Sequence, residues 1–113
     1  MSDLPIFKDY ARDVLKRRDQ DGVRGLYHEQ NRFVTHLEGA AFAAKRLDAI
    51  TRVDLRDWLR DMAATPKKHR PEETISDPTT KRAWSLVCAV FVDAEERELI
   101  ATGPHHRLMA VAA

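Results

Sequence analysis

Residues 77–104 read DPTTKRAWSLVCAVFVDAEERELIATGP, and they decide the fold class because they predict one long helix with a buried face. Asp77 suits an N-cap, and Pro78 suits the first helical position, where its missing N–H leaves no helical hydrogen bond unmade. Gly103-Pro104 is expected to end this helix. The apolar residues in between recur at helical spacing and form the predicted buried face: Ala83, Leu86, Val87, Val90, Phe91 and Ala94.

Three further helices are predicted upstream of this stretch. The first covers residues 6–20 and the second covers residues 24–38, where Gly39 closes it. The third begins after Thr51, a good N-cap with Asp54 three residues later. The predicted buried faces of the second and third helices are Leu26, Phe33, Val34 and Leu37, and Val53, Leu55, Trp58, Leu59 and Met62.

The segments between the helices complete the predicted architecture. A polar loop at residues 65–76 precedes the last helix, and the connection at residues 39–50 carries three apolar residues that are expected to fill the core: Phe42, Leu47 and Ile50. Only four glycines and few β-branched residues are present, which argues against a sheet. We therefore predict an all-α fold, a compact bundle of four helices.

Length and composition narrow the class further. The chain has 113 residues, 43% of them apolar and 33% charged, which is typical of one globular domain and not of a disordered chain. No apolar run is long enough to span a bilayer, and the start lacks a secretion signal. Cys88 is a single cysteine, so a reducing compartment fits, and we expect a cytoplasmic protein.

The charge distribution along the last predicted helix is more informative than the net charge of +1. Lys81 and Arg82 stand in its first turns, whereas its last turns are rich in carboxylates, the reverse of what the helix macrodipole favours. An external anion such as phosphate would offset the cost, since the helix-end N–H groups, Thr79, Thr80, Lys81 and Arg82 can all face it. The alternative is a solvated charged face placed by chance.

Two other segments carry groups suited to nucleic acid. On the second predicted helix, polar residues recur at i, i+3, i+4 and i+7 opposite the apolar stripe: Arg24, Tyr27, His28 and Asn31. Such side chains can reach phosphates or base edges. The polar loop adds three cations that can follow a DNA backbone: Lys67, Lys68 and Arg70. In both segments the alternative is an ordinary solvated surface.

No catalytic or cofactor constellation is evident. His105-His106 lacks carboxylate or cysteine partners at metal-ligand spacing, so a solvated turn is expected and no metal is predicted. Cys88 is interpreted as a small core residue and not as a nucleophile, and Trp58 and Trp84 as core residues. There is no glycine-rich phosphate loop, so we predict no cofactor and no small-molecule substrate.

The whole pattern resembles the N-terminal core-binding (SAM-like) domain of phage integrases and related tyrosine recombinases. Four stretches carry the resemblance: FKDYARDVLKRRDQDGV, RGLYHEQNRFVTHLEG, RLDAITRVDLRDWLRDMA and ISDPTTKRAWSLVCAVFVDAEERELIATGP. The resemblance implies that residues 1–104 form a core-binding domain and that residues 105–113 begin a linker to a catalytic domain absent from this chain. It therefore implies a DNA-binding module and not an enzyme.

The resemblance also implies a binding mode and partners. In the family this domain forms half of a clamp around a recombination site, with its second and fourth helices against the major groove of double-stranded DNA, and works with further recombinase protomers. The matching residues are Tyr27, His28 and Asn31, and Thr79, Thr80, Lys81, Arg82 and Ser85. The alternative is a helical protein–protein interaction module without DNA binding, for which the apolar tail, residues 108–113, is the candidate surface.

Overall fold

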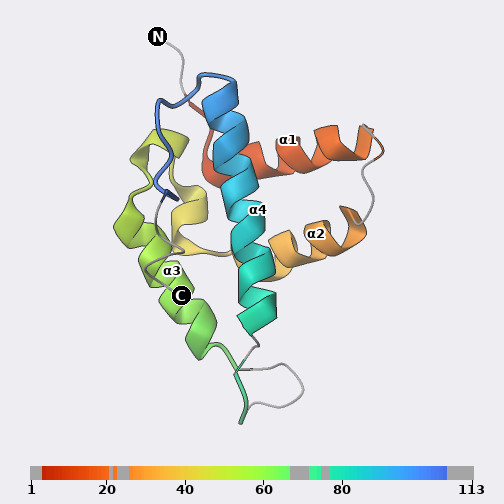
Figure 1. Ribbon diagram of the computed structural model, residues 1–113, viewed down its shortest axis with the longest axis vertical. Helices are drawn as coiled ribbons and strands as arrows, with labels where there is room; N and C mark the ends of the chain where they lie inside the picture. The colour runs from red at the N-terminus through yellow and green to blue at the C-terminus, as the bar shows by residue number, and fades with distance from the viewer. Residues whose placement is uncertain (1–3, 21, 23–25, 67–71, 75–76, 107–113) are drawn as a thin grey trace.

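The computed structural model describes residues 4–20, 22, 26–66, 72–74 and 77–106. These residues form the α-helices α1 (Phe7–Gln20), α2 (Leu26–Arg32), α3 (Arg52–Ala64) and α4 (Asp77–Glu96). The described ranges contain isolated bridges but no β-strand, so the predicted all-helical class is confirmed. In Figure 1, α4 crosses α1 and α2, and α3 lies along its other side. No helix of the described ranges is long and apolar enough to cross a membrane.

The core forms where α1, α3 and α4 meet the connection between α2 and α3. This connection folds into two short 3-10 helices, η2 (Ala41–Ala44) and η3 (Leu47–Ala49). The ring of Phe7 packs against those of Phe42 and Phe91, with centroids 5.0 and 5.5 Å away. Full burial of such a side chain contributes roughly 1.5–3 kcal/mol. The three residues predicted to fill the core from this connection are buried: Phe42, Leu47 and Ile50.

The second helix departs from the predicted pattern at its C-terminal end. α2 continues into the π-helical turn η1 (Phe33–Leu37), where the Glu38 N–H donates to the Phe33 carbonyl over 2.8 Å. One extra residue per turn rotates the side chains that follow. Phe33 and Leu37 are buried, but Val34 is 63% exposed. The prediction that Val34 belongs to the buried face was wrong: Val34 lies about 100° around the helix from Phe33, at the edge of that face.

The start of α3 confirms the predicted cap. The Thr51 hydroxyl accepts from the Asp54 N–H over 3.2 Å, and the Asp54 carboxylate accepts from the Thr51 N–H over 2.9 Å. This reciprocal capping box satisfies two N–H groups that the helix itself leaves without partners. Val53, however, is 59% exposed, contrary to prediction. It lies in the first turn, on the side of the helix opposite the buried residues, which are Leu55, Trp58, Leu59 and Met62.

The end of α4 lies well before the predicted stop. The helix ends at Glu96, and Glu98 adopts a left-handed backbone with φ of 62°. The Leu99 N–H then donates to the Ala94 carbonyl over 2.9 Å, a bond that closes the helix end. The helix does not run to Gly103 as predicted: the next positions on its buried face after Ala94 would be Arg97 and Glu98, which are charged and exposed. Gly103 serves another purpose: a Cβ there would lie 2.5 Å from Nδ1 of His105.

Candidate nucleic-acid interface

The structure describes the predicted residues of α4 and part of those of α2. Lys81, Arg82 and Ser85 are exposed on α4, and Thr79 and Thr80 are partly exposed in its first turn. On α2, His28 and Asn31 are exposed, and Tyr27 lies in the helix, although its side chain is outside the described part. The remaining predicted residues lie outside the described ranges: Arg24, Lys67, Lys68 and Arg70.

Arginines from three helices line one surface hollow of about 220 Å³, which we call the arginine hollow. Arg82 comes from α4, Arg18 from the last turn of α1 and Arg32 from the end of α2. The α4 residues Ser85, Leu86 and Ala89 complete the lining. The hollow thus joins the predicted basic start of α4 to α1 and α2.

Arg18 and Arg32 were not among the predicted site residues. Arg18 stands in the last turn of α1, where a cation interacts favourably with the macrodipole, and Arg32 lies in the middle of the predicted second helix, residues 24–38. From sequence, both are therefore explained as ordinary charges on a helix surface. The basic run at residues 16–18 is the one sequence signal for Arg18, and the convergence with Arg82 exists only in three dimensions.

The electrostatics of the arginine hollow favour an anion. Neither Arg32 nor Arg82 forms an ion pair with any carboxylate in the described part of the chain. Guanidinium groups stay charged at all physiological pH values and bind phosphate through paired N–H donors. The Ser85 hydroxyl donates to the Lys81 carbonyl over 3.0 Å, so its oxygen is left to accept from a partner. A phosphate in the hollow would reduce the mutual repulsion of the arginines.

The opposite end of α4 uses its charges within the molecule. Asp93 accepts two hydrogen bonds from Arg17 of α1, at 3.1 and 2.9 Å, and one from the Tyr10 hydroxyl. Burial and the adjacent Asp93 raise the pKa of Tyr10 to about 12. Arg97 also pairs with Asp93, at 3.3 Å. Arg17 is therefore engaged by Asp93, unlike Arg32 and Arg82 in the arginine hollow.

Cys88 lies between these two regions on α4. It lines a second hollow of about 370 Å³ that shares Arg18 and Ser85 with the arginine hollow. Burial raises the pKa of its thiol to about 11. The thiol is therefore protonated at neutral pH and is no nucleophile, in line with its interpretation as a small apolar residue.

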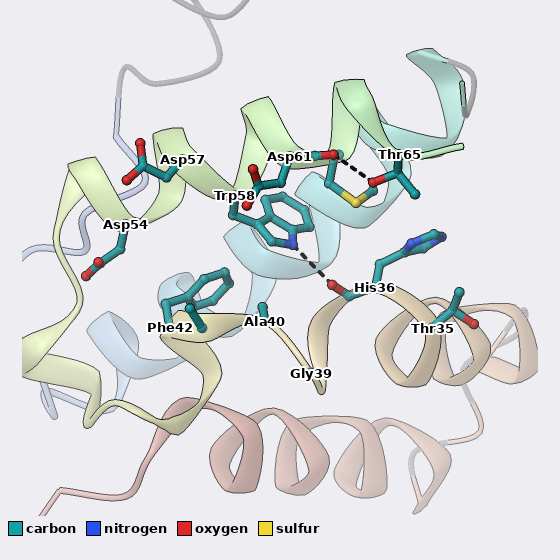
Figure 2. Close-up of a pocket in the computed structure, with 12 residues that line it drawn as sticks. Thr35, His36, Gly39, Ala40, Phe42, Asp54, Asp57, Trp58, Asp61 and Thr65 are labelled. Atoms are coloured by element: carbon teal, nitrogen blue, oxygen red, sulfur yellow. Dashed lines mark hydrogen bonds between the residues drawn. The ribbon is translucent and has the colours of Figure 1, made fainter. Parts of the chain in front are cut away.

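A further groove, of about 420 Å³, has the opposite charge (Figure 2). It lies between α3 and the segment that follows α2, and Asp54, Asp57 and Asp61 line its α3 side. The indole N–H of Trp58 donates to the His36 carbonyl across it, over 3.1 Å. Carboxylates repel phosphate, so this groove is unsuited to nucleic acid.

The two tryptophans support the core and not a stacking platform. Trp58 and Trp84 are 6% and 4% exposed, and their rings stack with centroids 6.4 Å apart. Their interpretation as core residues is confirmed. Because neither ring face is accessible, neither residue can stack on a nucleic-acid base.

The histidine pair near the C-terminus differs from prediction. His105 is only 7% exposed, and its ring stacks on Phe91 with centroids 5.6 Å apart. Nε2 of His106 lies 2.7 Å from Oε2 of Glu95. The expected solvated turn was therefore wrong for His105. Glu95 was missed as a partner because it stands on α4, eleven residues before His106, and approaches only through the turn after the helix.

Comparison of the chain with protein-family models, with curated proteins and with solved structures finds no match. The resemblance to integrase core-binding domains therefore stays a prediction.

Proposed function

We propose that this chain is a DNA-binding helical module that holds the phosphate backbone of a duplex in the arginine hollow. The observation that carries this proposal is the convergence of Arg18, Arg32 and Arg82 from three helices, two of them without a carboxylate partner in the described ranges. Three guanidinium groups in one shallow, open site suit a polyanion better than a small metabolite.

Binding at this face would draw on two kinds of contact. Neutralisation of phosphates by arginine releases counterions and supplies sequence-independent affinity. His28 and Asn31 are exposed on α2, the helix that also supplies Arg32, and offer hydrogen-bonding groups for base edges. Lys81 is exposed beside Arg82 and adds a further positive charge. We therefore expect modest affinity with some sequence preference.

The specific role that we propose is the core-binding half of a tyrosine recombinase, with catalysis performed by a separate domain. The support is the resemblance, which brings the second and fourth helices to the DNA, and the arginine hollow, to which α2 and α4 contribute Arg32 and Arg82. Further recombinase protomers are the expected partners on the same DNA.

The test is a titration of duplex DNA against the protein and two double variants at several salt concentrations, followed by fluorescence anisotropy. Arg32→Ala with Arg82→Ala removes two cations from the arginine hollow. Arg52→Ala with Arg56→Ala is the matched control, because it removes the same charge from exposed positions on α3. The slope of log K against log salt should fall in magnitude by about 2 in the first variant, at about 0.9 per phosphate contact.

Three outcomes would overturn the proposal. One is no binding of duplex DNA at about 50 mM salt, where phosphate contacts are strongest. Another is an equal loss in both double variants, which would show that net charge alone matters. The last is concentration-dependent dimerisation in sedimentation without DNA binding, which would favour the protein-interaction alternative.

A further inference from the structure

We infer that Glu95, His105 and His106 form a binding site for one divalent transition-metal ion of the zinc class at the C-terminal end of α4. One ligand atom from each of the three side chains lies within 4.8 Å of the others. Imidazole nitrogen and carboxylate oxygen are the donors that zinc accepts, together with thiolate. Three protein ligands leave a fourth, tetrahedral position for water, on the side where His106 is exposed.

The burial of His105 is the strongest single observation for this site. Its Nδ1 is buried and has no hydrogen-bond partner in the described structure. A buried polar atom without a partner destabilises the fold, and a bound metal ion would supply a partner for it.

The surroundings hold the ligands in place. The Gly103 N–H donates to Oε2 of Glu95 over 2.7 Å and orients the carboxylate. Phe91 fixes the plane of the His105 ring by stacking, and the missing side chain at Gly103 leaves room for that ring. In known metal sites, contacts of this kind orient the side chains that bind the metal.

Metal binding would need the donor atoms, which lie within 4.8 Å of one another, to move to the separations of a tetrahedral ion. Oε2 of Glu95 and Nε2 of His106 are 2.7 Å apart, whereas two donors of a tetrahedral zinc ion are about 3.3 Å apart. A rotation of the exposed His106 ring would open this distance and replace the hydrogen bond by two bonds to the metal. The bound ion would then fasten the turn at residues 103–106 to the end of α4.

The site is tested with tag-free protein, after treatment with a chelator, by calorimetric titration with Zn²⁺ and by the visible absorption of bound Co²⁺. We expect one Zn²⁺ per chain and a tetrahedral Co²⁺ spectrum. Glu95→Gln keeps an oxygen that accepts from Gly103, and His106→Ala changes an exposed residue, so both variants should fold. Each should lower Zn²⁺ affinity by at least about 10- to 100-fold, the range seen even for outer-shell partners.

Two matched controls separate the site from general metal binding. Glu96→Gln makes the same charge change at the neighbouring exposed position, and His28→Ala removes an exposed histidine from α2. Both should bind Zn²⁺ as the wild type does. The inference is overturned if no Zn²⁺ binds up to about 1 mM, where the binding free energy is only about −4 kcal/mol. It is equally overturned if the control variants lose as much affinity as Glu95→Gln and His106→Ala.

Discussion

The two ends of α4 carry opposite charges, and they use those charges in different ways. At the end of the helix, Asp93 bonds to Tyr10, Arg17 and Arg97, and Glu95 bonds to Gly103 and His106. At the start, Arg82 lines a hollow with Arg18 and Arg32 and has no carboxylate partner in the described ranges. One end is satisfied inside the molecule, and the other presents its charge to solvent.

This difference changes how the sequence pattern should be interpreted. A basic start and an acidic end both oppose the macrodipole. From sequence alone, the two charged ends are therefore treated together and explained by an external anion. The structure explains the acidic half through contacts with α1 and with the turn after α4. In the basic half, Arg82 has no such contact in the described ranges, and it shares its hollow with Arg32 of α2 and Arg18 of α1.

The largest effect on stability should come from removing the Asp93 contacts at the C-terminal end of α4. Asp93→Asn keeps the size of the side chain but removes the charge that holds Arg17, and both side chains are about three-quarters buried. Hydrogen bonds to charged groups contribute about 1.5–3 kcal/mol, so we expect the free energy of unfolding to fall by about 2 kcal/mol. Urea denaturation followed by circular dichroism measures this change.

Glu96→Gln is the control for Asp93→Asn. Glu96 is exposed on the same helix end, and its substitution should change the free energy of unfolding by less than about 0.5 kcal/mol. Equal losses of unfolding free energy in the two variants would mean that the Asp93 contacts do not stabilise the fold. The contrast between the two ends of α4 would then be wrong.

The fold was largely predictable because its signals are local. The helix positions, the Thr51 capping box and the apolar residues of the α2–α3 connection follow from spacing and cap chemistry within a few residues of chain. The misses arose where tertiary contacts override spacing. Val34, at the edge of the predicted buried face, is exposed, and the half-buried Leu99 and Ile100 pack against the core after α4 has ended.

The candidate site was only partly predictable because it is assembled from distant segments. Arg82 was found from its position at a helix start, where a cation is unexpected. Arg18 stands where a cation is expected and Arg32 in the middle of the predicted second helix, so nothing in their own helices marks them. Glu95 was missed as a partner of the histidines for the same reason: helical surfaces carry many carboxylates, and only the turn after α4 selects this one.

A smaller effect is expected in the pH dependence of stability. Burial alone would raise the pKa of Asp93, but hydrogen bonds from Arg17 and Tyr10, with the charges of Arg17 and Arg97, hold it below its ordinary value of 3.8. A lowered folded-state pKa contributes stability that is present above pH 3.8 and is lost as the pH falls through the folded-state value.

Urea midpoints at several pH values between 2 and 5 measure this dependence. Asp93→Asn should flatten it, since the amide does not titrate in this range. The change must be smaller than the total effect of Asp93→Asn at pH 7, because it reflects only the charge on the carboxylate. If the pH dependence of stability is unchanged in the variant, the loss of stability in acid comes from other carboxylates.

The smallest effect on stability should come from the basic end. Arg32→Ala with Arg82→Ala removes like charges that face no carboxylate in the described ranges, so the free energy of unfolding should stay the same or rise by less than about 0.5 kcal/mol. The same double variant is expected to weaken DNA binding. If this double variant weakens DNA binding and leaves the stability unchanged, the two arginines contribute to binding and not to the stability of the fold. A loss of stability above about 1 kcal/mol would instead show that the arginines pack against α4 through their aliphatic parts, and the contrast between the two ends of the helix would fail.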